Sequence, residues 1–173
     1  MYADYKDQTN QTLAHILGSF LRQFLTVAQE PIPDDIIEKL TQIHFQGRKA
    51  EIKDILDLLK IRLHQLKRAY IFIDAVDELE SKTRQRLLEI LEEMVIDYNI
   101  RLFLTGRNYI ESAVKRRFIV EKGYTIKISA SQQDIRELVR QQIRDDDDLN
   151  PEAMDTVLAK DMEDTIAEKS KGM

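Results

Sequence analysis

Apolar residues recur every three or four positions along most of the chain, which is the spacing of one face of an α-helix. The first such stripe covers residues 13–25 and predicts a helix that ends before the Pro-Ile-Pro segment at residues 31–33. Residues 34–43 show the same spacing over a shorter stretch, which Gly47 ends. A third stripe covers residues 52–66. The N-terminal part of the chain is therefore predicted to be helical.

The pattern changes at residues 69–74, where the sequence AYIFID is apolar or aromatic at five successive positions. Such a run is typical of a strand that is buried on both faces. A helical stripe follows at residues 87–95, and then a second continuous run, IRLFLT, at residues 100–105. A third strand is predicted at residues 124–129 (YTIKIS), where apolar and polar residues alternate and indicate a more exposed position.

Two further helices are predicted near the C-terminus. Ser131 and Asp134 have the spacing of a helix N-cap and precede an apolar stripe at residues 135–143. Asn150, which a proline follows, has the features of another helix start. The four aspartates at residues 145–148 lack the alternating ligands and the glycine of a calcium loop, so we interpret them as a solvated loop.

Strands that alternate with helices indicate a parallel sheet that helices cover. In such sheets, ligands bind at the carboxyl ends of the strands. Asp74, Asp77 and Glu78 follow the first buried run. Thr105 and Arg107 follow the second. We therefore expect these five side chains to gather at one edge of the sheet.

The residue types at this edge suit phosphate chemistry. A carboxylate at a strand end can hold Mg²⁺ beside the phosphates of a nucleotide. A second acid can orient or deprotonate the attacking water, and an arginine on the next strand can bind the terminal phosphate. The alternative is that Asp74 begins a turn, Glu78 faces solvent and residues 105–107 are a plain loop. Because acids follow one strand and Thr105 and Arg107 follow the next, we favour a domain that derives from a phosphate-binding protein.

These motifs resemble NACHT-type P-loop NTPases of the STAND class, in particular the fungal domains known as nephrocystin-3-like N-terminal domains. YIFIDAVDELES resembles their Walker B segment, and IRLFLTGRN resembles their sensor 1 strand. Residues 2–25 are similar to the second strand and the helix after it, and residues 130–143 to the segment after the last strand. The resemblance covers nearly the whole chain.

The resemblance implies an α/β fold, a three-layer P-loop NTPase sandwich with a mostly parallel sheet of strand order 5-1-4-3-2 and helices after it. Strands two, three and four are then residues 2–5, 69–74 and 100–105, and strand five is residues 124–129. The first strand, which lies between strands four and five in the family, is missing from this sequence.

The resemblance also implies roles for the residues at the sheet edge. Asp74 is expected to help to hold Mg²⁺. Asp77 and Glu78 are expected to position the water as catalytic residues, and Arg107 with Thr105 to sense the nucleotide. Mg²⁺ and ATP are the expected cofactors of a complete parent, a signalling switch that is closed with ADP and oligomeric with ATP.

The phosphate-binding loop of these NTPases, G-x-x-x-x-G-K-[ST], is absent from the 173 residues. In P-loop NTPases this loop supplies the backbone N–H groups and the lysine that hold the β- and γ-phosphates. We therefore expect Asp74 to hold Mg²⁺ only when such a loop is supplied, and this chain to bind nucleotide weakly or not at all. Residues 1–144 are then a partial NTPase core, and residues 145–173 the truncated start of a helical segment.

Composition narrows the other possibilities. The net charge of −5 gives no reason to expect nucleic-acid binding, which argues against a DNA-linked AAA-type ATPase. The chain has no cysteine, and no apolar run approaches the roughly 18 residues of a membrane span. We expect a cytoplasmic protein that associates with itself or with other domains of a multidomain parent. The alternative function is a non-catalytic interaction module that oligomerises through its helices or an open sheet edge.

Overall fold

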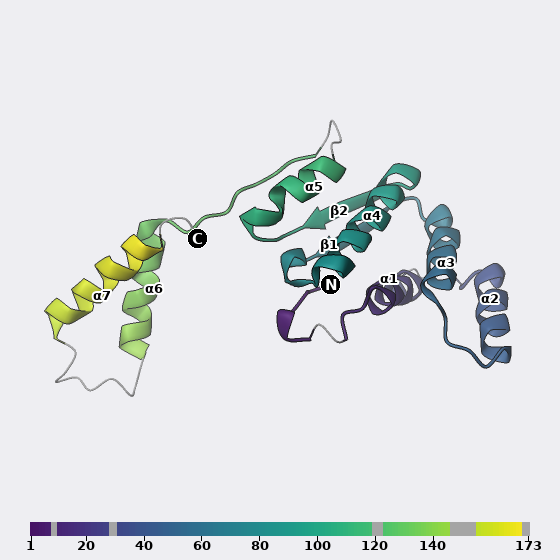
Figure 1. The fold of residues 1–173 in the computed structure, drawn as a ribbon, viewed down its shortest axis with the longest axis horizontal. Helices are drawn as coiled ribbons and strands as arrows, with labels where there is room; N and C mark the ends of the chain where they lie inside the picture. The colour runs from purple at the N-terminus through teal and green to yellow at the C-terminus, as the bar shows by residue number, and fades with distance from the viewer. Residues whose placement is uncertain (8–9, 28–30, 119–122, 146–154, 171–173) are drawn as a thin grey trace. The chain divides into compact units, whose positions relative to one another are not determined.

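The computed structural model describes residues 1–7, 10–27, 31–118, 123–145 and 155–170. The chain divides into two compact units, Met1–Gly123 and Tyr124–Met173. The fold is mixed α/β, with mostly helices and a small parallel sheet in the first unit (Figure 1). None of the described helices is long and apolar enough to cross a membrane. The expected change of segment at residue 145 stays a prediction.

Three helices form the N-terminal part of the first unit, and all three lie where the sequence predicted helices. They are α1 (Leu13–Val27), α2 (Asp34–Phe45) and α3 (Ile52–Gln65). α3 packs against both of the others. Their buried apolar side chains join one core, at roughly 1.5–3 kcal/mol for each large side chain buried; they include Ile16, Leu17, Phe20, Leu58, Leu59 and Leu63.

Arg62 is a charged side chain inside this core, with 1 % of its surface exposed. Its Nε donates to the backbone oxygen of Phe24 at 3.2 Å, and its Nη1 donates to the side chain of Gln65 at 3.2 Å. Phe24 lies in the last turn of α1, where carbonyl oxygens lack helical partners and carry partial negative charge. Arg62 therefore ties α3 to the C-terminal end of α1.

The sheet of the first unit is a parallel pair of strands, β1 (Ala69–Ile73) and β2 (Ile100–Leu104). Ala69 lies opposite Ile100, and the pairing continues without a break. α4 (Ser81–Asp97) provides the crossover that parallel neighbours require. Both strands and their parallel direction are confirmed.

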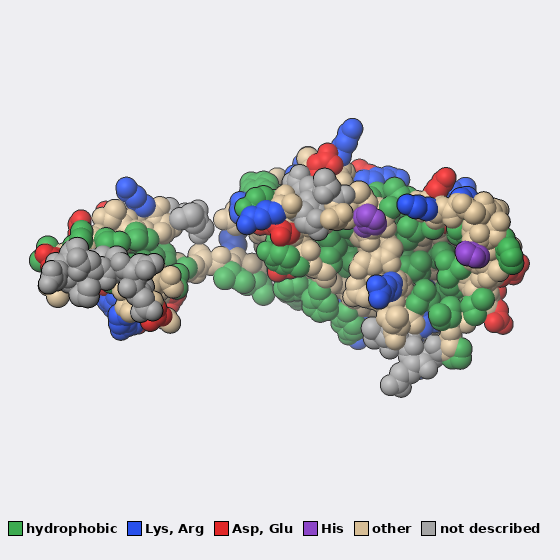
Figure 2. Space-filling model, turned by 90° about the horizontal axis from the view of Figure 1, so that it is seen from below, with side chains coloured by type: hydrophobic (Ala, Val, Ile, Leu, Met, Phe, Trp, Pro, Cys, Tyr) green, Lys and Arg blue, Asp and Glu red, His purple; other side chains and the backbone are tan. Residues whose placement is uncertain are grey.

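The prediction that residues 69–74 are buried on both faces is wrong. Along β1 the side chains alternate, so that Ala69, Ile71 and Ile73 are buried while Tyr70 and Phe72 are 55 % and 58 % exposed. The buried face joins the core formed with α1, α3 and α4, and the other face has no covering element among the described residues. Figure 2 shows hydrophobic side chains gathered on the surface of the first unit.

The N-terminal residues lie beside the outer edge of β1. Tyr2 and Asp74 form an isolated parallel bridge. The amide of Asp74 donates to the oxygen of Met1 at 2.9 Å, and the amide of Ala3 donates to the oxygen of Asp74 at 3.0 Å. These bonds satisfy the backbone groups at the end of β1, so that residues 1–3 pair with β1 as a very short third strand would.

The predicted strand at residues 2–5 is therefore longer than the one that forms. Tyr5–Asp7 is a short 3₁₀ helix, η1. The carboxylate of Asp4 accepts the amide of Lys6 at 2.9 Å, which is the local bond that turns a chain after aspartate. Asp4 also exchanges two hydrogen bonds with the side chain of Gln11, and the extended segment ends there.

The predicted third strand at residues 124–129 is wrong. These residues have no regular secondary structure, and Tyr124, Ile126 and Ile128 are exposed by 80 % or more. A strand needs a neighbour for its backbone N–H and C=O groups, and no described strand pairs with these residues. The alternating pattern is compatible with a strand, but a strand forms only when a neighbouring strand is available to pair with it.

The second unit contains a pair of helices, α6 (Gln132–Asp145) and α7 (Thr156–Lys169), that pack against each other. The predicted N-cap of α6 is confirmed, because the amide of Asp134 donates to Ser131 Oγ at 3.1 Å. Hydrogen bonds from Ser131 hold the pKa of Asp134 below its usual value. The predicted helix start at Asn150 lies outside the described residues.

Ion pairs cross between the two helices of the second unit. Arg136 pairs with Asp164 at 3.0 Å, and Arg140 pairs with Glu163 at 2.9 Å. Asp155 caps α7 by accepting the amide of Leu158 at 2.7 Å. The pairs are partly exposed, so they fix the register of the helices more than they stabilise them.

Candidate functional site

Thr105 joins the carboxyl ends of the two strands. Its Oγ1 donates to the carboxylate of Asp74 and accepts the amide of Ala75 at 2.8 Å. Its amide donates to the oxygen of Ile73 at 3.0 Å, and its own oxygen accepts the amide of Val76 at 2.9 Å. Four hydrogen bonds therefore hold the residue after β2 against the residues that end β1.

Ala75 has a left-handed backbone conformation, with φ 55° and ψ 43°. This conformation costs a residue with a Cβ atom roughly 1–2 kcal/mol. The hydrogen bond to Thr105 helps to maintain it. The turn at Ala75 redirects the chain from β1 into a short 3₁₀ helix, η2 (Val76–Glu78), which carries the two remaining acids.

Asp77 is a buried carboxylate with three donors around it. Its side chain accepts the amide of Arg107 at 3.3 Å and the hydroxyl of Tyr109 at 3.3 Å, and Arg107 Nε lies 3.6 Å away. Its backbone oxygen accepts from Arg84 Nη1 at 3.0 Å and from Tyr109 at 3.1 Å. Asp77 is therefore fixed by the connection between β2 and α5 (Glu111–Arg117), which carries Arg107 and Tyr109, and by Arg84 of α4.

Gly106 allows the loop after β2 to approach Asp77. A Cβ atom at this position would lie 2.6 Å from Ile110 Cδ1 and 3.2 Å from Asp77 Oδ1. The first of these distances is too short for any real contact, so with a larger residue either the buried Ile110 side chain or the loop must shift. Glycine between Thr105 and Arg107 therefore fits the packing as it stands.

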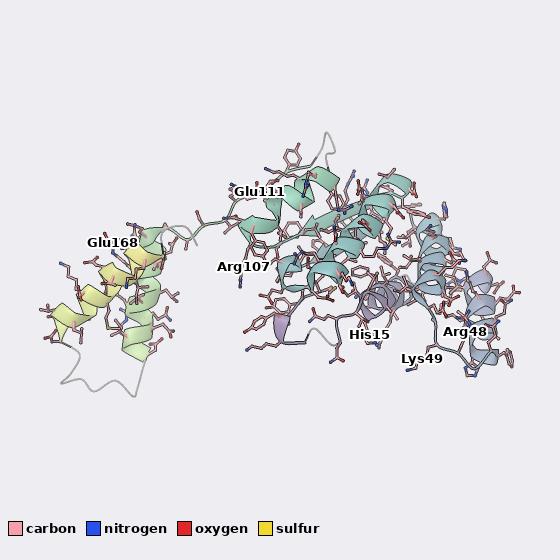
Figure 3. All side chains as sticks on the ribbon, viewed as in Figure 1. His15, Arg48, Lys49, Arg107, Glu111 and Glu168 are labelled. Atoms are coloured by element: carbon pink, nitrogen blue, oxygen red, sulfur yellow. The ribbon has the colours of Figure 1, made fainter. Side chains whose placement is uncertain are left out.

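Glu78 contacts two separate segments with its two carboxylate oxygens. Oε2 accepts the amide of Tyr5 at 3.2 Å, and Oε1 lies 3.9 Å from Arg107 Nη2. Arg107 projects from the loop between β2 and α5, and its side chain is 73 % exposed (Figure 3). One arginine thus supplies positive charge to both Asp77 and Glu78.

A hollow of about 550 Å³ lies beside these groups. The residues that line it include Tyr5, Asp77, Glu78, Glu80, Arg107 and Tyr109. Within the described residues, no three acidic or histidine side chains converge to form a metal site by themselves. A cation at Asp74 would therefore take its other ligands from water or from a bound anion.

The five candidate residues lie at the same edge of the sheet, where the sequence analysis expected them. Their side chains form two groups. Asp74 and Thr105 form the first group, and Asp77, Glu78 and Arg107 form the second. Sequence reasoning missed three further residues that complete the site, namely Tyr5, Arg84 and Tyr109. The position of Tyr109, two residues after Arg107, was the available signal.

The sequence model of the family described as Nephrocystin 3, N-terminal matches residues 1–107. The matched range includes both strands and all five predicted site residues, and it ends at Arg107. Comparisons with curated proteins and with solved structures gave no match.

Replacing Ala75 tests the strain at the end of β1. We expect Ala75→Val to lower the free energy of unfolding by about 1–2 kcal/mol, since a β-branched residue tolerates the left-handed conformation poorly. Ala75→Gly is expected to leave stability unchanged or to raise it by up to about 1 kcal/mol. Urea denaturation measures both changes.

The control for this experiment is Ala113→Gly in the helix α5, where glycine should destabilise by up to about 1 kcal/mol. An Ala75→Val protein as stable as the unmodified chain would show that the turn carries no strain.

Replacing Gly106 tests the close approach to Asp77. We expect Gly106→Ala to destabilise the protein by about 1–3 kcal/mol, because the new methyl group overlaps Ile110 Cδ1. Ile110→Val removes that carbon atom, so Gly106→Ala should cost less in the Ile110→Val background. Urea denaturation of the unmodified chain, the two single variants and the double variant gives the coupling free energy between the two positions.

Gly18→Ala is the matched control, since nothing lies within 4 Å of its Cβ position in α1. This substitution should stabilise the protein by up to about 1 kcal/mol. Equal costs of Gly106→Ala in the two backgrounds would contradict the packing explanation.

Proposed function

The chain belongs to the nephrocystin 3 N-terminal family, whose sequence model matches more than half of it, and we propose that it is part of a NACHT-type nucleotide-binding domain of a STAND signalling switch. The single observation that carries this proposal is the meeting of the acids after β1 with Thr105 and Arg107 after β2. The parallel pair with the N-terminal segment on its outer edge agrees with the order 4-3-2 of part of a P-loop NTPase sheet.

Asp74 is the proposed ligand of Mg²⁺. Its residue is exposed at the strand end, and the hydroxyl of Thr105 orients the carboxylate. A single carboxylate with phosphate oxygens and water is the usual environment of Mg²⁺ in nucleotide sites. The 173 residues contain no phosphate-binding loop, so we propose that this site is filled only when such a loop is supplied.

Glu78 is the acid best placed to position a water molecule. Its side chain is 17 % exposed, whereas that of Asp77 is 3 % exposed. Asp77 already accepts from Arg107 and Tyr109, so its contribution is to hold the loop that carries Arg107. Both acids line the hollow, and the pair proposed as catalytic thus divides into one that is more exposed and one that is buried and holds the loop.

Arg107 is the proposed sensor of the terminal phosphate. Its ion pairs with Asp77 and Glu78, at 3.6 and 3.9 Å, are longer than the roughly 2.8 Å of a strong charge-assisted hydrogen bond. Arg107 is the exposed partner in both pairs, so water and salt compete for its guanidinium group. A phosphate group, with more charge and better hydrogen-bond geometry, can therefore draw Arg107 away from the acids.

A second candidate function is a protein-interaction module that does not use nucleotide. Tyr70 and Phe72 of β1 and Phe103 of β2 are each more than half exposed on one face of the sheet. Among the described residues, β2 has β1 as its one neighbour, so its other edge is unpaired. Aromatic surface beside an open strand edge favours association. A discrete oligomer that does not respond to ATP would distinguish this function from the first.

Nucleotide binding by the chain itself is the first test. Titration calorimetry with ATP and Mg²⁺ should give no binding, or a dissociation constant weaker than about 1 mM. Tight binding that depends on Mg²⁺ would show that the chain has phosphate-binding groups other than a P-loop. The 5′ end of the transcript shows whether an in-frame G-x-x-x-x-G-K-[ST] motif lies upstream.

The roles of the acids are tested in a chain extended through such a motif. We expect Glu78→Gln to lower ATP hydrolysis by about 10²–10⁴-fold while binding persists, since the water loses its base. Asp74→Asn should weaken binding in the presence of Mg²⁺. The matched control is Glu80→Gln, an acid that lines the same hollow. Hydrolysis at the normal rate by the Glu78→Gln protein would exclude the proposed role.

A further inference from the structure

Glu78 connects the loop of Arg107 to the N-terminal segment. Its two carboxylate oxygens are divided between them, Oε2 with the amide of Tyr5 at 3.2 Å and Oε1 with Arg107 Nη2 at 3.9 Å. The three residues come from parts of the chain that are far apart in the sequence. The same carboxylate therefore contacts the proposed phosphate sensor and the beginning of η1.

The N-terminal segment has attachments on both sides of Tyr5. Before it, the backbone of Met1 and Ala3 is bonded to the end of β1. After it, the chain leads through the Asp4–Gln11 hydrogen bonds toward α1. The amide of Tyr5 lies between these anchors, and its bond to Glu78 holds η1 against η2.

Of the two interactions of Glu78, the ion pair with Arg107 is weaker than the hydrogen bond with Tyr5. The two groups are 3.9 Å apart, and the arginine is 73 % exposed, so water and salt compete with the pair. The attraction between Arg107 and Oε1 nevertheless favours the carboxylate orientation in which Oε2 accepts the amide of Tyr5. When Arg107 moves, Glu78 gains rotational freedom and the amide of Tyr5 loses a fixed acceptor.

We propose that Glu78 transmits the position of Arg107 to the N-terminal segment, so that an anion which draws Arg107 away loosens η1. The proposal rests on the proposed function only in naming a phosphate group as that anion. The coupling itself is a property of the chain without nucleotide. It assigns to the site a regulatory output, which is the release of the segment that leads into α1.

Amide hydrogen exchange in the full 173-residue chain, followed by NMR without nucleotide, tests the coupling. We expect Arg107→Gln to speed exchange at Tyr5 by about threefold to tenfold, the factor that one hydrogen bond accounts for. In a Glu78→Gln background, Arg107→Gln should change this rate by less than about twofold. An unchanged or slower rate in the single variant, or an equal effect in both backgrounds, would overturn the proposal.

Arg86→Gln is the control, because Arg86 forms a comparable exposed pair with Glu89 on α4 and should leave the rate at Tyr5 unchanged. The amide of Ile71 in β1 reports whether the variants keep the fold. A second measurement needs no change at Arg107. Raising NaCl to about 1 M screens the ion pair, so exchange at Tyr5 should accelerate in the unmodified chain and not in Glu78→Gln.

The two proposals can fail separately. If hydrogen exchange shows no coupling, the role of Glu78 in ATP hydrolysis is unaffected and is tested separately. Normal hydrolysis by an extended Glu78→Gln chain would remove that role and leave the coupling in place.

Discussion

The parallel pairing of β1 and β2 is the constraint on which the candidate site depends. Parallel strands have their carboxyl ends at the same edge, so the residues after each strand meet although α4 separates them in sequence. Thr105 fixes the contact between the two strand ends by bonding to four successive residues, Ile73 to Val76. Without this pairing, the residues after β1 and the residues after β2 would not meet. Arg107 would then lie away from Asp77 and Glu78, and Asp74 would lose its hydrogen bond to Thr105.

The three acids near the end of β1 repel one another and need compensation, which each obtains in a different way. Asp74 receives a hydroxyl group from Thr105. Asp77 receives donors from Arg107 and Tyr109, and Glu78 receives the amide of Tyr5 with Arg107 nearby. Donors from the chain therefore stabilise the acids, and a cation or phosphate bound there, as we propose, would exchange with these partners instead of entering a cluster of uncompensated charge.

Much of this arrangement could be predicted from the sequence, because the spacing of apolar residues distinguishes helices from strands. The runs at residues 69–74 and 100–105 predicted two parallel strands, and the polar residues after them predicted the edge at which the candidate site lies. Periodicity does not report partners. For that reason residues 124–129 were predicted as a strand although no described strand pairs with them, and β1 was predicted to be covered on both faces.

The contacts that complete the site could not be predicted from the sequence for a related reason. The position of Tyr109 near Arg107 was a signal, but no local motif shows that Tyr109 and Arg84 donate to the oxygens of Asp77. Arg62 of α3, outside the site, has the same limit, because its acceptor at Phe24 depends on how α1 packs. Contacts between loops are set by tertiary packing, which local patterns do not encode.

The two candidate functions use different parts of the same strands. Nucleotide chemistry needs the residues at the strand ends, whereas association would use the exposed face, where Tyr70, Phe72 and Phe103 lie. The rings of Phe72 and Phe103 are 5.7 Å apart, so the two strands present one aromatic surface. Because alternate side chains of a strand point to opposite faces, a partner on this surface would leave the buried face in place. A partner on the aromatic face would therefore leave the strand ends, where Thr105 contacts Asp74, open to the proposed nucleotide.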